Sequence, residues 1–97
     1  MKPVEIYVKE NCPWCARARQ LLMSRGALFT EKDITYAPEL KEEMIRRTGG
    51  RDTTPQIFIG GEYIGDYEAL KRLDETGELP RKLSYTGNPD DIRTTHV

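Results

Sequence analysis

The chain has few of the residues from which disulfide-rich scaffolds and zinc sites are built. Only two cysteines and one histidine occur among its 97 residues. Small secreted domains usually carry four or more scattered cysteines, whereas Cys12 and Cys15 stand three apart in one motif. A structural zinc site needs about four ligands, and His96 lies far along the chain. We therefore expect no metal site, and the cysteine pair favours redox chemistry in a reducing compartment.

Long hydrophobic runs and an excess of one charge are also missing. The longest apolar runs span only a few residues, which is too short for a transmembrane helix or a signal-peptide core. The 15 basic and 16 acidic side chains leave a net charge of -1, without the concentrated basic surface that binds nucleic acid or an anionic membrane. We expect a cytoplasmic protein with neither of these as a partner.

The residues that are present suit one domain. Hydrophobic residues make up 37% and charged residues 32% of the chain, a balance that supplies one layered core at this length. From residue 85 onward the sequence holds turn formers and charges but no periodic apolar face. We expect a domain over residues 1–84 and a flexible or loosely docked tail over 85–97 that folding and catalysis do not need.

Hydrophobic periodicity predicts an α/β protein with the element order βαβαββα. The first strand alternates Val4, Ile6 and Val8 with polar residues, so we expect one of its faces on the core. Strands joined through a helix form a parallel pair, whereas the closing hairpin at Gly60-Gly61 is antiparallel, so the sheet is mixed. The expected elements are strands at about 4–9, 28–33, 56–59 and 62–64, and helices at about 13–24, 37–48 and 68–76.

The two cysteines lie where a reactive thiol can be made. Pro13 can occupy the first helical position, so Cys12 stands at a helix N-terminus, where unpaired amides and the helix dipole stabilise a thiolate. Lys9 adds a nearby positive charge, and we expect the pKa of Cys12 to fall well below its usual value of about 8.5. Cys12 is then the nucleophile. Cys15, one turn further and more buried, is the resolving thiol.

In these features the chain resembles the glutaredoxin family. The resemblance implies a thioredoxin-like fold with a four-stranded mixed sheet flanked by three or more helices, and a cis peptide bond before Pro55 that faces Cys12. Pro13 and Pro55 would support the active site. The matching segments are Glu5-Ile6-Tyr7-Val8-Lys9, Cys12-Pro13-Trp14-Cys15, Thr53-Thr54-Pro55-Gln56-Ile57-Phe58-Ile59 and Tyr63-Ile64-Gly65, in family order over about residues 3–84.

The resemblance also implies a glutathione site. The backbone of Thr54 would pair with the cysteinyl part of glutathione like an added strand. Lys9 would meet a glutathione carboxylate and Trp14 would pack beside the tripeptide, although Lys9 also suits a solvated strand end and Trp14 a cover for the helix start. Tyr67 and Glu68 would offer helix-start amides to the γ-glutamyl carboxylate.

One loop departs from the family pattern. Relatives commonly have two glycines, a variable residue and two acidic or hydroxyl residues, whereas here Asp66 replaces the second glycine and Ala69 the second acidic residue. Asp66 suits the N-cap of the last helix. Arg51 is a candidate partner for the glycine carboxylate of glutathione, or an ordinary solvated arginine.

The function that the resemblance implies is that of a monomeric, glutathione-dependent thiol–disulfide oxidoreductase. It would reduce disulfide-containing and glutathionylated proteins, with glutathione as electron donor and no permanently bound cofactor. Two alternatives are a glutaredoxin-like thioredoxin served by a flavoprotein reductase, and an iron–sulfur carrier whose cluster is held by Cys12 and glutathione. The rigid ring of Pro13 beside Cys12 counts against the iron–sulfur carrier.

Overall fold

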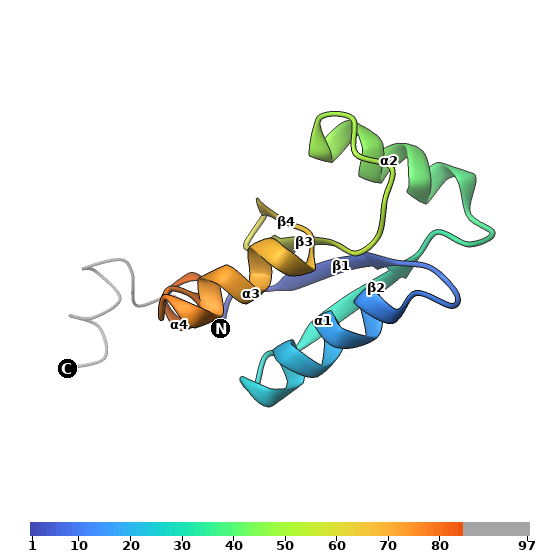
Figure 1. Ribbon diagram of the computed structural model, residues 1–97. Coiled ribbons are helices and arrows are strands. Elements are labelled where there is room, and N and C mark those ends of the chain that lie inside the picture. The colour runs from blue at the N-terminus through green and yellow to red at the C-terminus, as the bar shows by residue number, and fades with distance from the viewer. Residues whose placement is uncertain (85–97) are drawn as a thin grey trace.

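A computed structural model describes residues 1–84, so the expected tail over 85–97 lies outside the described residues and its role stays a prediction. The helices and strands follow the predicted order, with a short fourth helix added at the end (Figure 1). None of the helices within this part of the chain is both long and apolar enough to cross a membrane. The elements are β1 (Val4–Val8), α1 (Pro13–Ser24), β2 (Phe29–Asp33), α2 (Pro38–Thr48), β3 (Gln56–Ile59), β4 (Glu62–Gly65), α3 (Tyr67–Glu75) and α4 (Leu79–Leu83).

The four strands form one mixed sheet in the order β2-β1-β3-β4. β1 runs parallel to β2 and antiparallel to β3, and β3 pairs with β4 as an antiparallel hairpin. The predicted mixed sheet is therefore confirmed. The antiparallel register places Tyr7 opposite Gln56, so the chain that leaves β1 lies beside the chain that enters β3.

The larger core lies between the sheet and the helices α1, α3 and α4. Ile6 of β1, Leu22 of α1 and Leu70 of α3 are fully buried in it. In α1 the buried face consists of Cys15, Ala18 and Leu22, whose spacing places them on one side of a helix. Ala16, although apolar, is exposed, because it follows Cys15 and successive helix positions are rotated by about 100°.

The second face of the sheet is also covered, which the alternation along the first strand did not indicate. Tyr7 is fully buried and packs with Ile34, Met44 and Phe58 in a smaller cluster. Successive strand residues point to opposite faces, so Ile6 enters the larger core while Tyr7 enters this one. The expectation that only one face of β1 meets a core was wrong, because α2 lies on the side of the sheet opposite α1 (Figure 1).

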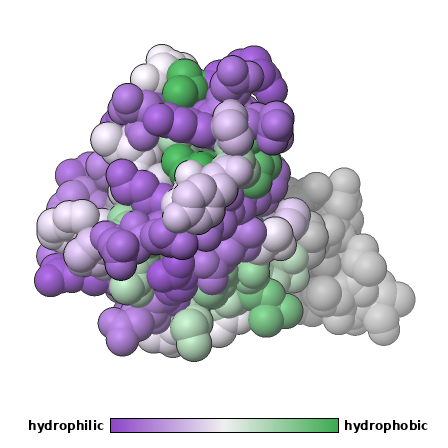
Figure 2. All heavy atoms as spheres, turned by 90° about the vertical axis from the view of Figure 1, so that its right-hand side faces the viewer, coloured by the Kyte–Doolittle hydropathy of each residue, from purple (hydrophilic) through white to green (hydrophobic). Residues whose placement is uncertain are grey.

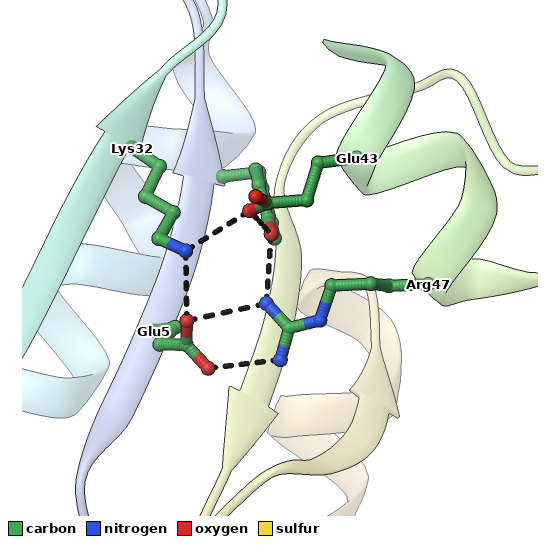
Figure 3. Close-up of polar contacts among 5 residues, drawn as sticks. Glu5, Lys32, Glu43 and Arg47 are labelled. Atoms are coloured by element: carbon green, nitrogen blue, oxygen red, sulfur yellow. Dashed lines mark hydrogen bonds and ion pairs between the residues drawn. The ribbon is translucent and has the colours of Figure 1, made fainter. Parts of the chain in front are cut away.

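Charged side chains close the rim of the smaller cluster (Figure 3). The guanidinium of Arg47 donates to both carboxylate oxygens of Glu5, at 2.9 and 3.2 Å, and to the hydroxyl of Tyr7 at 2.7 Å. The ammonium of Lys32 lies 3.0 Å from carboxylate oxygens of Glu5 and Glu43. The hydrogen bond from Arg47 is the main reason why the pKa of Glu5 falls to about 2. These contacts join β1, β2 and α2.

The short helix α4 is the element that the sequence analysis missed. It is a single turn of five residues, too short for a periodic pattern. Its signal was Pro80 in the first turn, with Leu79 and Leu83 four residues apart. Both leucines are buried in the larger core, and the Lys2 amide donates to the Leu83 carbonyl at 2.7 Å. Helix α4 therefore closes the end of the core where the chain begins.

Replacing Leu79 by alanine should destabilise the protein by about 2–5 kcal/mol, because the side chain is fully buried and its removal leaves a cavity. Denaturant unfolding measures this change. The matched control is Leu28→Ala, at a leucine that is 83% exposed, where we expect a change within about 0.5 kcal/mol. Equal effects of the two substitutions would show that α4 does not belong to the core.

Candidate active site

Cys12 caps the N-terminus of α1. Asn11 takes a left-handed backbone conformation with φ of 55°, and Cys12 returns to an extended one before the helix begins at Pro13. The Cys12 sulfur accepts a hydrogen bond from the Cys15 amide at 3.2 Å. Pro13 has no amide to leave unpaired at the first helical position. The predicted helix start is confirmed, and the sulfur itself serves as the capping acceptor.

A second chain segment meets the same sulfur. The peptide bond between Thr54 and Pro55 is cis, as the family resemblance implies. The Thr54 hydroxyl donates to the Cys12 sulfur at 3.5 Å, and the Cys12 thiol donates to the Thr54 carbonyl at 3.6 Å. The entry to β3 thus contributes a hydrogen-bond donor that can stabilise a thiolate at Cys12.

The surroundings give the two thiols opposite acidities. Burial raises the pKa of Cys12, but hydrogen bonds from the Cys15 thiol, Thr54 and the Cys15 amide, together with the charge of Lys9, outweigh it and lower the pKa below its ordinary value. Burial and, as the second cause, the hydrogen bond to Cys12 raise the pKa of Cys15 to about 11. Cys12 is partly accessible, whereas Cys15 is fully buried. Of the two thiols, Cys12 is therefore the one that ionises first to the anion as the pH rises.

The loop before Cys12 is held by residues that the sequence analysis did not single out. The Glu10 amide donates to the Thr35 hydroxyl at 2.9 Å, and that hydroxyl donates to the Asp33 carboxylate at 2.6 Å. The Thr35 amide also donates to Asp33, at 2.9 Å. An aspartate followed by a threonine two residues later is a known signal for such a turn. These bonds fix the loop between β1 and α1 against the end of β2.

A groove of about 310 Å³ lies next to the Thr54–Cys12 contact. Trp14 is half-exposed, and its ring contacts that of Tyr67, with 5.8 Å between the ring centres; both side chains line the groove. Figure 2 looks onto the end of the molecule that lies on the right in Figure 1, where mostly hydrophilic side chains surround small apolar patches. The groove brings together most of the residues predicted to contact glutathione, since its lining is Trp14, Thr53, Thr54, Pro55, Asp66, Tyr67 and Glu68.

Lys9 does not line this groove. It lies at a separate hollow, beside Asn11, Thr35, Lys41 and Asp52 among others. Lys9 follows the last residue of β1 and is exposed, so its charge acts on Cys12 from outside the groove. The structure thus divides the predicted glutathione contacts between two neighbouring hollows.

The loop that departs from the family pattern is built around Asp66. Its carboxylate caps α3 by accepting from the Ala69 amide at 3.1 Å, and it lies 3.6 Å from the guanidinium of Arg51. Arg51 is thus paired with a carboxylate of the chain itself. Gly65 has a φ of 128°, and a Cβ there would lie 2.8 Å from the Ala69 Cβ, so the loop needs glycine at this position.

The arrangement defines a class of protein. A mixed four-stranded sheet with a Cys-x-x-Cys motif at a helix N-terminus, opposite a cis-proline, is the thioredoxin-like architecture of thiol–disulfide oxidoreductases. The family model described as glutaredoxin matches residues 4–64. The chain belongs to the glutaredoxin family, and both the recognition and the fold class expected from the sequence are confirmed.

Individual relatives agree with this assignment. Glutaredoxin 3 of Escherichia coli strain K12 is 49% identical over 79 residues, which cover 81% of this chain and 94% of the relative. The solution structure of a Brucella melitensis glutaredoxin has a TM-score of 0.77 and 45% identity, over 91% of this chain and 94% of that one. A buckwheat glutaredoxin–glutathione complex has a TM-score of 0.79 and 25% identity, covering 89% of this chain and 80% of that one.

Alkylation should distinguish the two thiols in the reduced protein. Iodoacetamide reacts with thiolates, so its rate at Cys12 should rise with pH through a midpoint below the ordinary cysteine value, because the pKa of Cys12 is lowered. Cys15 should stay unmodified at neutral pH, because its pKa of about 11 and its burial both oppose reaction. Mass spectrometry of peptides measures both rates. Faster modification of Cys15 would contradict the assignment of the anionic thiol.

Proposed function

We propose that the chain is a glutathione-dependent oxidoreductase that reduces protein disulfides and protein–glutathione mixed disulfides. The observation that carries the proposal is the opposite direction of the two pKa shifts, downward at Cys12 and upward to about 11 at Cys15. An accessible thiolate beside a buried protonated thiol is the arrangement that a nucleophile and a resolving thiol require. Residues 1–84 would form the catalytic unit, working in the reducing cytoplasm.

The reaction begins at Cys12. Its thiolate attacks one sulfur of a protein disulfide, a mixed disulfide forms, and the other substrate sulfur leaves as a thiolate. The hydrogen bond between Cys15 and Cys12 contributes to the raised pKa of Cys15, and this contribution ends once Cys12 is in a disulfide. Cys15 then loses its proton and attacks Cys12. The substrate leaves with two thiols, and the protein holds a Cys12–Cys15 disulfide.

Glutathione would restore the thiols. One glutathione thiolate attacks the Cys12–Cys15 disulfide to form a mixed disulfide at Cys12, and a second releases oxidised glutathione. The groove beside Thr54 supports this donor, because it adjoins the sulfur and a solved relative is a glutaredoxin–glutathione complex. Tyr67 and Glu68 are the first residues of α3, so their amides have no partner inside the helix and would donate to the γ-glutamyl carboxylate. Pro13 and Pro55 would shape the two segments that meet at Cys12.

Serine substitutions at the two cysteines test this mechanism. Cys12→Ser should abolish all activity, because a hydroxyl is not ionised at neutral pH. Cys15→Ser should keep deglutathionylation, since free glutathione resolves that mixed disulfide, but should greatly slow reduction of protein disulfides. Both rates are measured with glutathione, glutathione reductase and NADPH. A parallel assay contains thioredoxin reductase and NADPH but neither glutathione nor glutathione reductase. Activity with thioredoxin reductase alone would refute glutathione dependence.

The charge of Asp66 should weaken glutathione binding modestly. Asp66→Gly removes a carboxylate near the γ-glutamyl site and frees Arg51, so we expect the glutathione KM to fall by up to about fivefold with little change in kcat. It also removes the cap of α3, at a cost of about 1 kcal/mol of stability.

Asp66→Asn is the matched control, because the amide oxygen can still cap α3 while the charge is lost. It should lower KM without the loss of stability, and high salt should reduce the difference between each variant and the unaltered protein. A higher KM in both variants would instead mean that the Asp66 carboxylate holds the glutathione ammonium.

A further inference from the structure

A third, shallow hollow of about 480 Å³ lies on the α1–α3 side of the molecule. Four of its lining residues come from α1 and one from α3, and they combine one apolar side chain, one charge, two neutral polar groups and an aromatic ring. They are Arg17, Gln20, Leu21, Ser24 and Tyr67. None of the α1 residues has a role in the mechanism above, so the hollow has no assigned function.

The hollow continues the groove beside Cys12. Tyr67 lines both, and the Trp14 ring that stacks against it at 5.8 Å borders the first groove. The guanidinium of Arg17 lies 4.8 Å from the centre of the same Trp14 ring and lines the hollow between α1 and α3. A chain that leaves the first groove over the Trp14–Tyr67 pair therefore arrives at Arg17.

The charge at this hollow lacks a counter-ion. Helix α1 contains no acidic residue. Its other arginine, Arg19, pairs with Glu31 at 2.8 Å, whereas Arg17 has no carboxylate within ion-pair distance among the described residues. Lys71 follows Tyr67 by four residues on α3, so it extends from the same side of that helix and adds a second positive charge nearby. The hollow thus favours an acidic ligand.

We propose that this hollow is a docking site for an extended, acidic segment of a protein disulfide substrate. The proposal rests on the proposed function, because the residues at the reacting cysteine would occupy the groove beside Thr54. The segment would then cross the Trp14–Tyr67 pair, place a carboxylate against the Arg17 guanidinium and lay an apolar side chain on Leu21. Guanidinium and carboxylate form paired hydrogen bonds, and aromatic rings are common anchors at protein interfaces.

The spacing of Cys12 and Arg17 along the chain indicates where an acidic residue of the substrate would lie. Arg17 follows Cys12 by five residues, which corresponds to about 7.5 Å of rise along α1. An extended chain advances about 3.3 Å per residue, so the acidic residue should lie two or three positions from the reacting cysteine. Glutathione has too short a chain to occupy the first groove and reach this hollow as well.

The test uses synthetic peptides that contain one intramolecular disulfide. The peptides come in matched pairs that carry either Glu or Lys at the same position. That position is two or three residues from a cysteine, before it in some pairs and after it in others. The reduced protein is mixed with each peptide without glutathione, and the peptide gains two thiols as Cys12 and Cys15 form their disulfide. Mass spectrometry after acid quenching gives the rate. We expect one set of Glu peptides to react at least about fivefold faster than the matching Lys peptides at low salt.

Charge reversal assigns this preference to the hollow. Arg17→Glu should invert the ratio of Glu-peptide to Lys-peptide rates, and taking a ratio cancels any change in the reactivity of Cys12 itself. Arg81→Glu is the matched control, because it makes the same change of charge in α4 at an exposed side chain that lines neither hollow. It should preserve the preference for Glu peptides.

Three results would overturn the docking site: equal rates for Glu and Lys peptides in the unaltered protein, an unchanged ratio in Arg17→Glu, or an equal loss of preference in Arg81→Glu. Turnover of a small uncharged disulfide with glutathione is measured separately. If the protein does not turn over this disulfide with glutathione, the proposed function is contradicted. The peptide ratios are measured without glutathione, so they would still test the docking site.

Discussion

The active site depends on one contact between distant parts of the chain, the approach of Thr54 to the sulfur of Cys12. The antiparallel pairing of β1 with β3 produces it, because Tyr7 lies opposite Gln56 and the chain therefore leaves β1 where it enters β3. Cys12 follows β1 and Thr54 precedes β3, so their meeting at 3.5 Å is a consequence of strand register. The groove, whose lining includes Thr54 and Pro55, lies at the same place for the same reason.

The difference between the two thiols comes from one helical turn. Cys12 precedes the helix, where its sulfur can accept the Cys15 amide and the Thr54 hydroxyl. Cys15 lies inside the first turn on the face that enters the larger core, and it is fully buried beside Ala18 and Leu22. The same helix thus stabilises the charged form of one sulfur and the neutral form of the other. The position of each cysteine relative to the helix start, together with the Thr54 hydroxyl and the charge of Lys9, thus makes Cys12 the more acidic thiol.

The parts of the fold that were predicted correctly are those with a local signal. The helix start at Pro13, the hairpin turn at Gly60-Gly61 and the cap at Asp66 each follow from residues within a few positions of one another. Helix α4 was missed because one turn is too short to show a period. Tyr7 was placed on a polar face because alternation along a strand cannot show that a second helix covers the other side.

By itself the sequence determined the order of the elements, the position of the reactive thiol and, through its resemblance to a family, the chemistry. These depend on short-range spacing, which the chain carries in any conformation. Only the tertiary structure decided that Lys9 lies outside the groove that holds Trp14 and Tyr67, and that Arg51 is paired with Asp66. Such contacts join residues far apart in the chain, and they exist only once strand register and helix packing have brought those residues together.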